Sequence, residues 1–216
     1  MIDSANDYRQ DTMNKAEWAE GINLTEELIA PGRANRSGTP MRPTKITIHN
    51  TDNRGRGADA HAHSRFVRET GWYEHNGKRI LVSWHYTVDD RIAIRQLPDF
   101  ERGMHAGSGE GNAYSLGVEI CMQAGIDQEA ANLRAAQLTA LLLVEHDIPV
   151  DGVVQHRHWS GKPCPSLLMD EMKWAAFLAT VRACVNALCT KWEDFPGEAP
   201  LPEPFIFRGA MCWDEQ

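Results

Sequence analysis

Lys45-Ile46-Thr47-Ile48-His49 decides the fold, because its apolar and polar side chains alternate as they do in a half-buried strand. Ile46 and Ile48 fall on one face of this strand, and His49 falls on the other. Further along the chain, Ser115–Met122 repeats the alternation and carries Glu119 on its polar face. The two segments therefore predict strands that bury one face and keep polar side chains on the other.

A third alternating segment, Arg79–Asp89, adds His85 to the polar rows. We expect it to form one strand, with Arg91–Gln96 returning beside it as a hairpin partner. Each of the three strands then has an apolar row opposite a row that contains His49, His85 or Glu119. These polar rows are expected to share one face of a sheet, and that face would carry the chemistry.

Segments with a longer apolar period surround the strands. Ala58–Thr70 predicts a short helix that begins at Asp59 as its cap. Asp127–His146 predicts an amphipathic helix and Ser166–Trp192 a long one, whereas Gly152–His156 is expected as a short buried strand. The pattern predicts an α/β fold with a single mixed central β-sheet flanked by α-helices, whose apolar face packs under the long helices.

The length of 216 residues is typical of one domain with short extensions. We expect an N-terminal extension over residues 1–30, the folded domain over residues 31–192 and an extended, proline-rich tail over residues 193–216. The aromatic side chains of the tail are expected to pack against the domain.

Charge and composition exclude several classes of protein. The formal net charge of −8 argues against nucleic-acid binding, since proteins that bind phosphate backbones usually have a basic face. No run of about 18 apolar residues is present to span a membrane, and Met1–Asp7 lacks the features of a secretory signal. The five cysteines are odd in number and irregularly spaced, which favours reduced thiols. We expect a monomer that is synthesised in the cytoplasm without a signal peptide.

The segment Val154–Pro165 holds the densest group of chemically active side chains. Imidazole and thiolate are ligands that zinc prefers, and a catalytic zinc typically has three protein ligands. Cys164 and one histidine of the segment can supply two of them, but the spacing leaves open whether that histidine is His156 or His158. His49, at the end of its strand, is the natural third ligand.

Prolines on both sides of Cys164 favour an extended backbone, in which Lys162 points the same way as the cysteine. A rival hypothesis makes Cys164 the nucleophile of a cysteine hydrolase, with His156 or His49 as its base. The prolines disfavour this rival, because such a nucleophile usually lies at the start of a helix. Trp72 and Tyr73 either line a sugar groove or anchor a loop, and the sequence assigns no role to His61, His63, His75 or His146.

Five stretches in a fixed order carry a family resemblance: Ile46–Thr51, Ser83–Asp90, His105–Gly107, Ser115–Cys121 and Trp159–Pro165. Together they resemble the zinc-dependent N-acetylmuramoyl-L-alanine amidases of the amidase-2 group, which share their fold with phage T7 lysozyme and the peptidoglycan recognition proteins. The likeness is greatest to Bacillus prophage endolysins and autolysins, and it covers about residues 31–168.

The resemblance implies a zinc ion held by His49, His156 and Cys164, and so selects His156 over His158. It implies that Glu119 is the catalytic acid and base and that Lys162 stabilises the transition state. Substrate-binding positions are expected at His105, Asn112, Trp84 and His85, where His85 is interpreted as a histidine that orients a ligand or the substrate. Some relatives have a tyrosine at the position of Trp84, and tryptophan cannot relay a proton.

The implied reaction is hydrolysis of the amide bond between N-acetylmuramic acid and L-alanine in peptidoglycan. An endolysin of this kind would act on the cell wall after release from the cytoplasm, with a holin as the releasing partner. The alternative on the same fold is a non-catalytic module that only binds peptidoglycan. The presence of Cys164, Glu119 and Lys162 disfavours that alternative.

Overall fold

A mixed six-stranded sheet forms the centre of the computed structural model, which describes residues 15–193. The strand order is β1-β6-β5-β7-β2-β8, where β5 and β6 are antiparallel and the other neighbouring pairs are parallel. The strands, in chain order, are β1 (Leu24–Glu26), β2 (Lys45–Asn50), β5 (Tyr86–Val88), β6 (Ala93–Arg95), β7 (Ser115–Ile120) and β8 (Val153–Gln155). The predicted fold class is therefore confirmed.

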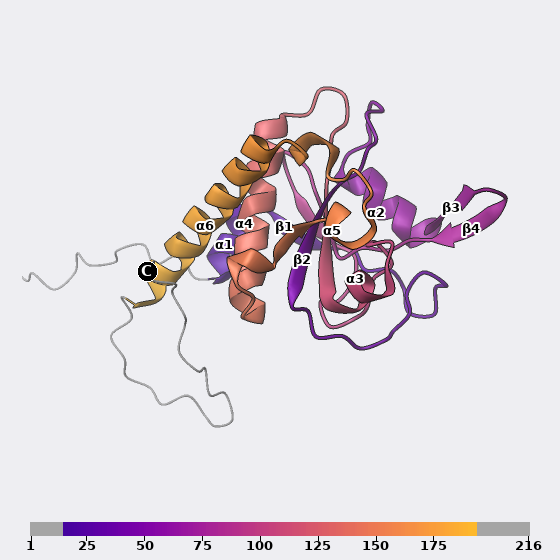
Figure 1. Ribbon diagram of the computed structural model, residues 1–216, viewed down its shortest axis with the longest axis horizontal. Coiled ribbons are helices and arrows are strands. Elements are labelled where there is room, and N and C mark those ends of the chain that lie inside the picture. The colour runs from indigo at the N-terminus through magenta and orange to yellow at the C-terminus, as the bar shows by residue number, and fades with distance from the viewer. Residues whose placement is uncertain (1–14, 194–216) are drawn as a thin grey trace, which may run out of the picture.

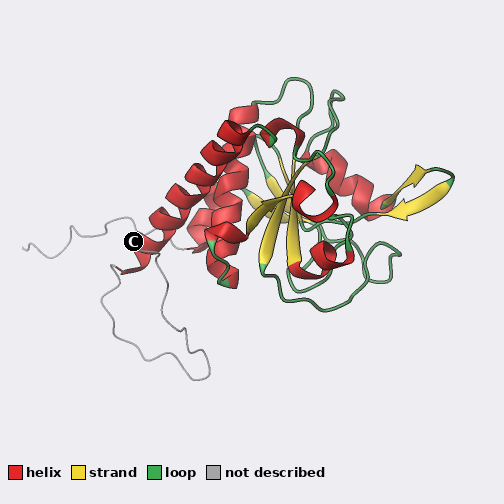
Figure 2. Cartoon of the chain, in the orientation of Figure 1, coloured by secondary structure: helices red, strands yellow, loops and turns green. Residues whose placement is uncertain are grey.

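Helices cover both faces of this sheet (Figures 1 and 2). On one side lie α1 (Lys15–Gly21), α4 (Gln128–His146) and α6 (Glu171–Glu193); on the other lie α2 (Ala60–Glu69), α3 (Gly109–Tyr114) and α5 (Arg157–Ser160). The short turns η1 (Val150–Gly152) and η2 (Ser166–Leu168) lead into β8 and α6. Apolar side chains of β2 and β7, such as Ile48 and Val118, pack with α4 and α6 in the main core. The long helices therefore cover the apolar face, as predicted.

Register places the expected polar side chains beside one another. His49 of β2 is the direct partner of Glu119 of β7, and Glu119 is in turn the partner of Thr87 on β5. Partners across neighbouring strands point to the same face of a sheet. His49 and Glu119 therefore lie side by side on the face opposite the main core.

The prediction of one continuous strand over Arg79–Asp89 is wrong. Residues 82–85 separate β5 from β4 (Lys78–Leu81), which pairs with β3 (Trp72–His75) in a two-stranded hairpin outside the main sheet. Asn76 and Gly77 connect β3 and β4 with positive φ angles of 49° and 71°, the backbone that a tight hairpin turn requires. The hairpin projects from the end of α2 (Figure 1).

Two other boundaries differ from the predicted ones. The helix expected from Ser166 begins only at Glu171, because Asp170 Oδ1 accepts hydrogen bonds from the backbone N–H groups of Met172 and Lys173 and so caps the helix there. The loop before β7 contains the short helix α3, whose cap is Ser108. The predicted cap Asp59 of α2 is confirmed by its side-chain bond, and Asp127 caps α4 in the same way.

Residues 15–30 belong to the folded domain, which differs from the N-terminal extension expected there. Trp18 and Ile22 are buried in the main core, and β1 pairs with β6 at the edge of the sheet. The rest of the expected extension and the tail aromatics Phe195, Phe205, Phe207 and Trp213 lie outside the described residues. Within residues 15–193, no helix is both long enough and apolar enough to cross a membrane.

Candidate active site

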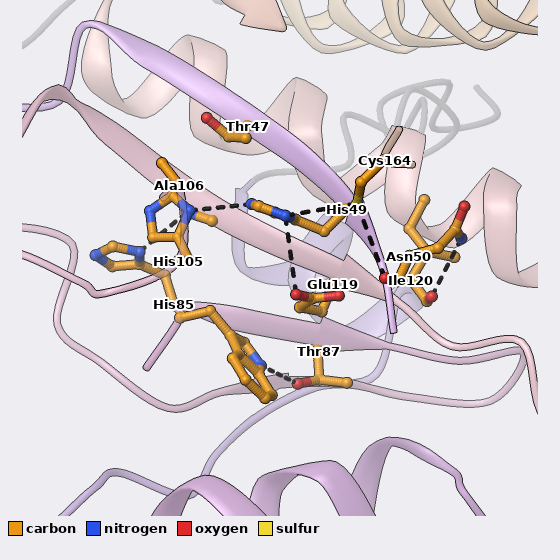
Figure 3. A network of polar contacts seen from close by, with 12 residues as sticks. Thr47, His49, Asn50, His85, Thr87, His105, Ala106, Glu119, Ile120 and Cys164 are labelled. Carbon is orange, nitrogen blue, oxygen red and sulfur yellow. Dashed lines mark hydrogen bonds and ion pairs between the residues drawn. The ribbon is translucent and has the colours of Figure 1, made fainter. Parts of the chain in front are cut away.

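Three buried side chains meet on the polar face of the sheet. His49 ends β2, His156 directly follows β8, and Cys164 lies in the loop between α5 and η2. One potential ligand atom from each lies within 4.8 Å of the others, and Cys164 Sγ is 3.8 Å from His49 Nδ1 (Figure 3). His158 is exposed and stacks edge-on against Trp159 instead. The cluster therefore contains the histidine that the resemblance selects.

A relay of hydrogen bonds determines which nitrogen of His49 is available to this cluster. The carbonyl of Ser115 can only accept, so His105 donates from Nε2 over 3.1 Å and its Nδ1 is left as an acceptor. His49 Nε2 then donates to His105 Nδ1 over 3.0 Å. The lone pair of His49 is thereby left on Nδ1, which faces Cys164 Sγ and Glu119 Oε1.

The unpartnered atoms of the cluster fit a metal ion. Both ring nitrogens of His156 and Oε2 of Glu119 are enclosed and have no hydrogen-bond partner of ordinary geometry among the described residues. Two imidazoles and a thiol are donors that zinc prefers, and buried polar atoms normally have partners. Burial holds the pKa of His49 well below its usual range, so its ring is neutral as a ligand must be. These three residues could therefore hold zinc.

Glu119 lies at the edge of the cluster. Its Oε1 is 3.9 Å from His49 Nδ1, and its side chain is 14% exposed. Burial raises the pKa of Glu119 to about 8, against the opposing effect of Lys162 and with a smaller contribution from Asp52. With this pKa the side chain is mainly protonated near pH 7 when no ion is present, and a cation bound beside it would favour the carboxylate form.

Lys162 is exposed and lines the cleft above the cluster. The backbone N–H of Cys164 donates to the Lys162 carbonyl over 2.7 Å, so the chain makes a tight turn here and the expectation of an extended segment is wrong. The lysine nevertheless reaches the site: its charge opposes protonation of both His49 and His156.

The four residues expected to bind substrate have different surroundings. Asn112 Oδ1 accepts from the N–H groups of His105 and Ala106 and so holds the loop that carries His105. Trp84 donates from Nε1 to Thr87 Oγ1 over 2.7 Å. Asn112, His105 and Trp84 have surface on the cleft. His85 has no surface on the cleft: it is fully buried, donates to the Glu101 carbonyl and accepts from the Gly117 N–H.

A cleft of about 660 Å³ opens above the cluster. No role in the site was predicted from the sequence for several residues that line this cleft: Thr51, Asn53, His63, Phe66, Ile80 and Ser160. The Asn-Gly pair at residues 76 and 77 is a sequence signal for a hairpin turn and could have predicted the hairpin that supplies Ile80 to the cleft. His63 had no such signal, because a histidine on a short helix is usually a surface residue.

The family profile described as N-acetylmuramoyl-L-alanine amidase matches residues 39–167. The N-acetylmuramoyl-L-alanine amidase CwlH of Bacillus subtilis (strain 168) is 41% identical over 160 residues, which are 73% of this chain and 60% of the relative. The amidase XlyA of the same strain is 41% identical over 162 residues, 74% of this chain and 51% of the relative. The chain thus spans between half and two thirds of the length of these relatives.

Solved structures show the same similarity. The catalytic domain of XlyA has a TM-score of 0.66 and 42% identity, and the match covers 74% of this chain and 99% of that one. The solution structure of the PlyG catalytic domain has a TM-score of 0.64 and 30% identity, with 76% of this chain and 95% of that one covered. From the profile, the identities and the fold together, we conclude that the chain belongs to the N-acetylmuramoyl-L-alanine amidase family.

Proposed function

We propose that this chain is a zinc-dependent enzyme that hydrolyses the amide bond between N-acetylmuramic acid and L-alanine in peptidoglycan. The observation that carries the proposal is the group of three buried, zinc-preferring side chains at the base of a cleft, next to a carboxylate with a raised pKa. Membership of the N-acetylmuramoyl-L-alanine amidase family supports this choice of bond.

His49 would bind the ion through Nδ1, together with His156 and Cys164. When bound, zinc supplies a Lewis acid that polarises the scissile carbonyl and makes water more acidic. The buried thiol of Cys164, whose pKa burial raises to about 12, would release its proton when it becomes a ligand. His105 orients His49 and touches no reacting atom, so it is a positioning residue in this mechanism.

Glu119 is the proposed acid and base. The carboxylate form of Glu119 would be favoured by the charge of a bound zinc, and it would take the proton from the attacking water and deliver it to the nitrogen of the departing L-alanine. Because Oε2 has no partner among the described residues, it is free to accept that proton. The ammonium group of Lys162, at the rim of the cleft, would stabilise the negative charge that develops on the scissile carbonyl oxygen.

Two rival functions explain the geometry less well. A cysteine hydrolase needs a thiolate, but burial raises the pKa of Cys164 and the residue lies in a loop instead of at a helix start. A module that only binds peptidoglycan has no use for a base beside a cluster of metal ligands. The amidase reaction uses every one of these groups.

The proposal also covers where the protein works. We expect a monomeric catalytic domain over about residues 31–192, completed by the helix and edge strand of residues 15–30. As an endolysin of prophage type, it would be synthesised in the cytoplasm and act on the cell wall after holin-dependent release. Fractionation of cells before and after lysis, with immunodetection of the chain, tests this part.

The deciding experiment is an assay of purified protein on isolated cell walls. The expected result is release of new L-alanine amino termini, loss of this activity with a chelator, and recovery when zinc is added back. Metal analysis should give about one zinc per chain. Activity that survives the chelator but is lost on alkylation would instead favour the cysteine hydrolase, and binding to walls without any release would favour the non-catalytic module.

A further inference from the structure

The cleft continues from the candidate metal cluster along α2 to the projecting hairpin. We call this part the hairpin arm, and its lining consists of Ala62, His63, Phe66, Tyr73, Ile80, Leu81, Val82 and Trp84. In Figure 1, α2 lies between the central sheet and the β3–β4 hairpin, so the arm leads away from the sheet. The opposite end of the cleft is lined by Gly107 of the loop before α3, Ser160 at the end of α5 and Lys162 of the loop after α5.

The hairpin exposes apolar surface to the arm. Tyr73 is 49% exposed, and Ile80 and Leu81 are each 37% exposed. Tyr73 and Ile80 are direct partners in the β3–β4 register, so their side chains lie on the same face of the hairpin. Apolar side chains grouped on an exposed surface that is continuous with a reaction cleft indicate a surface that a ligand covers.

His63 adds one polar group to this lining. Its Nδ1 donates to the Asp59 carbonyl over 2.9 Å, which leaves Nε2 as a hydrogen-bond acceptor. His63 Nε2 has no hydrogen-bond partner among the described residues. This atom is also not fully enclosed, so a ligand can reach it. Burial also lowers the pKa of His63, so the ring is neutral near pH 7. His63 can therefore accept a hydrogen bond from a ligand in the arm.

The described residues that line the arm carry no charge at neutral pH, whereas the other part of the cleft contains the ammonium group of Lys162. An aromatic ring, aliphatic side chains and one neutral acceptor suit a ligand with apolar C–H faces and hydroxyl donors. A pyranose ring has both of these features. A peptide with free carboxylates would instead favour the end of the cleft near the ammonium group of Lys162.

We propose that the hairpin arm binds the sugar rings of the glycan strand, with Tyr73 and Ile80 against their apolar faces and His63 Nε2 accepting from a hydroxyl group. This inference rests on the proposed function, in which the scissile amide joins a sugar to a peptide. With that bond over the metal cluster, the glycan extends along α2 towards the hairpin, and the stem peptide extends towards Ser160 and Lys162.

Binding of the full chain to peptide-free glycan strands tests the proposal directly, because this ligand has no amide bond to cut. The expected result is binding by the unchanged chain that Tyr73→Ala weakens about tenfold, the loss typical of a stacked aromatic contact. Tyr73→Phe keeps the ring and should bind as the unchanged chain does. Glu74→Ala is the matched control, since Glu74 is exposed on the same strand but does not line the cleft.

A free stem peptide is the second probe, and its affinity should be equal for the unchanged chain and Tyr73→Ala. Equal glycan binding by both proteins would overturn the proposal, and so would a loss of peptide affinity in Tyr73→Ala. In hydrolysis of polymeric peptidoglycan, Tyr73→Ala should raise KM by a similar factor and leave kcat much less affected. If the unchanged chain binds glycan in this way but releases no amino termini, the proposed function fails and the sugar site stands.

Discussion

Gly117→Ala is predicted to weaken zinc binding although Gly117 touches no proposed ligand. Gly117 lies in β7 against the ring of His105, and an added Cβ would be 2.7 Å from His105 Cγ and 2.8 Å from its Nδ1. Ordinary contacts begin at 3.4 Å. The ring must therefore move by about 0.7 Å in a closely packed interior. A displacement of that size exceeds what the 3.0 Å bond between His105 and His49 can tolerate.

The magnitude follows from the role of this bond. Losing the group that orients a metal-binding histidine typically lowers metal affinity about 10- to 100-fold. We expect a loss in this range for Gly117→Ala, measured by competition with a chromogenic zinc chelator. The backbone N–H of Gly117 that donates to His85 is unchanged by the substitution, so the sheet should keep its structure.

Two further variants make this prediction decisive. Gly109→Ala is the matched control, because a Cβ there meets only Arg102 at an ordinary 3.8 Å. Adding Gly117→Ala to His105→Ala should cause almost no additional loss, since the two changes remove the same hydrogen bond. Unchanged zinc affinity in a folded Gly117→Ala protein would refute the relay from Ser115 through His105 to His49, and so would additive losses.

Three other predictions concern catalysis and stability. Glu119→Gln should keep one zinc per chain by metal analysis and lower kcat at least about 10²-fold, and near-normal turnover would place the base elsewhere. Lys162→Met should keep zinc and lower kcat about 10²- to 10³-fold in the amino-terminus assay, whereas a change confined to KM would make the lysine a substrate-binding group. For His85, burial lowers the pKa in the folded chain to about 4 from the usual 6.5, so its contribution to stability is complete above pH 6.5 and is lost as the pH falls towards 4. The lost free energy of unfolding is about 3 kcal/mol. Urea unfolding of the zinc-free protein at a series of pH values measures it, and His85→Gln should remove this dependence between pH 6.5 and 4. Parallel pH profiles for the unchanged chain and the variant would contradict the lowered pKa of His85.

Strand alternation was enough to predict the centre of the fold. The polar and apolar rows of Lys45–His49 and Ser115–Met122 correspond to β2 and β7, and they bring His49 and Glu119 together as expected. Alternation failed over Arg79–Asp89, because a period of two is the same in the main sheet and in a separate hairpin. The Asn76–Gly77 turn was the local signal that separates the two cases.

The site was less predictable than the sheet. The spacing in Val154–Pro165 could not choose between His156 and His158, because the choice depends on which ring is buried after β8 ends. The role of His105 depends on bonds to His49 and Ser115, which only the folded chain brings together. His85, which was also expected to bind substrate, likewise has both of its hydrogen-bond partners, Glu101 and Gly117, in other segments of the chain.

The pairing of β2 with β7 has a consequence for how this site can change over evolution. A ladder of backbone hydrogen bonds holds the His49 and Glu119 positions at the spacing between neighbouring strands. A slip of either strand by one residue would turn its own site residue into the main core and separate the two side chains. His156 and Cys164 come from connecting segments, which tolerate insertion and substitution far better than a central strand does. Drift towards another metal or coordination number should therefore begin at these two loop positions, while the histidine and glutamate of the sheet are inherited as a pair.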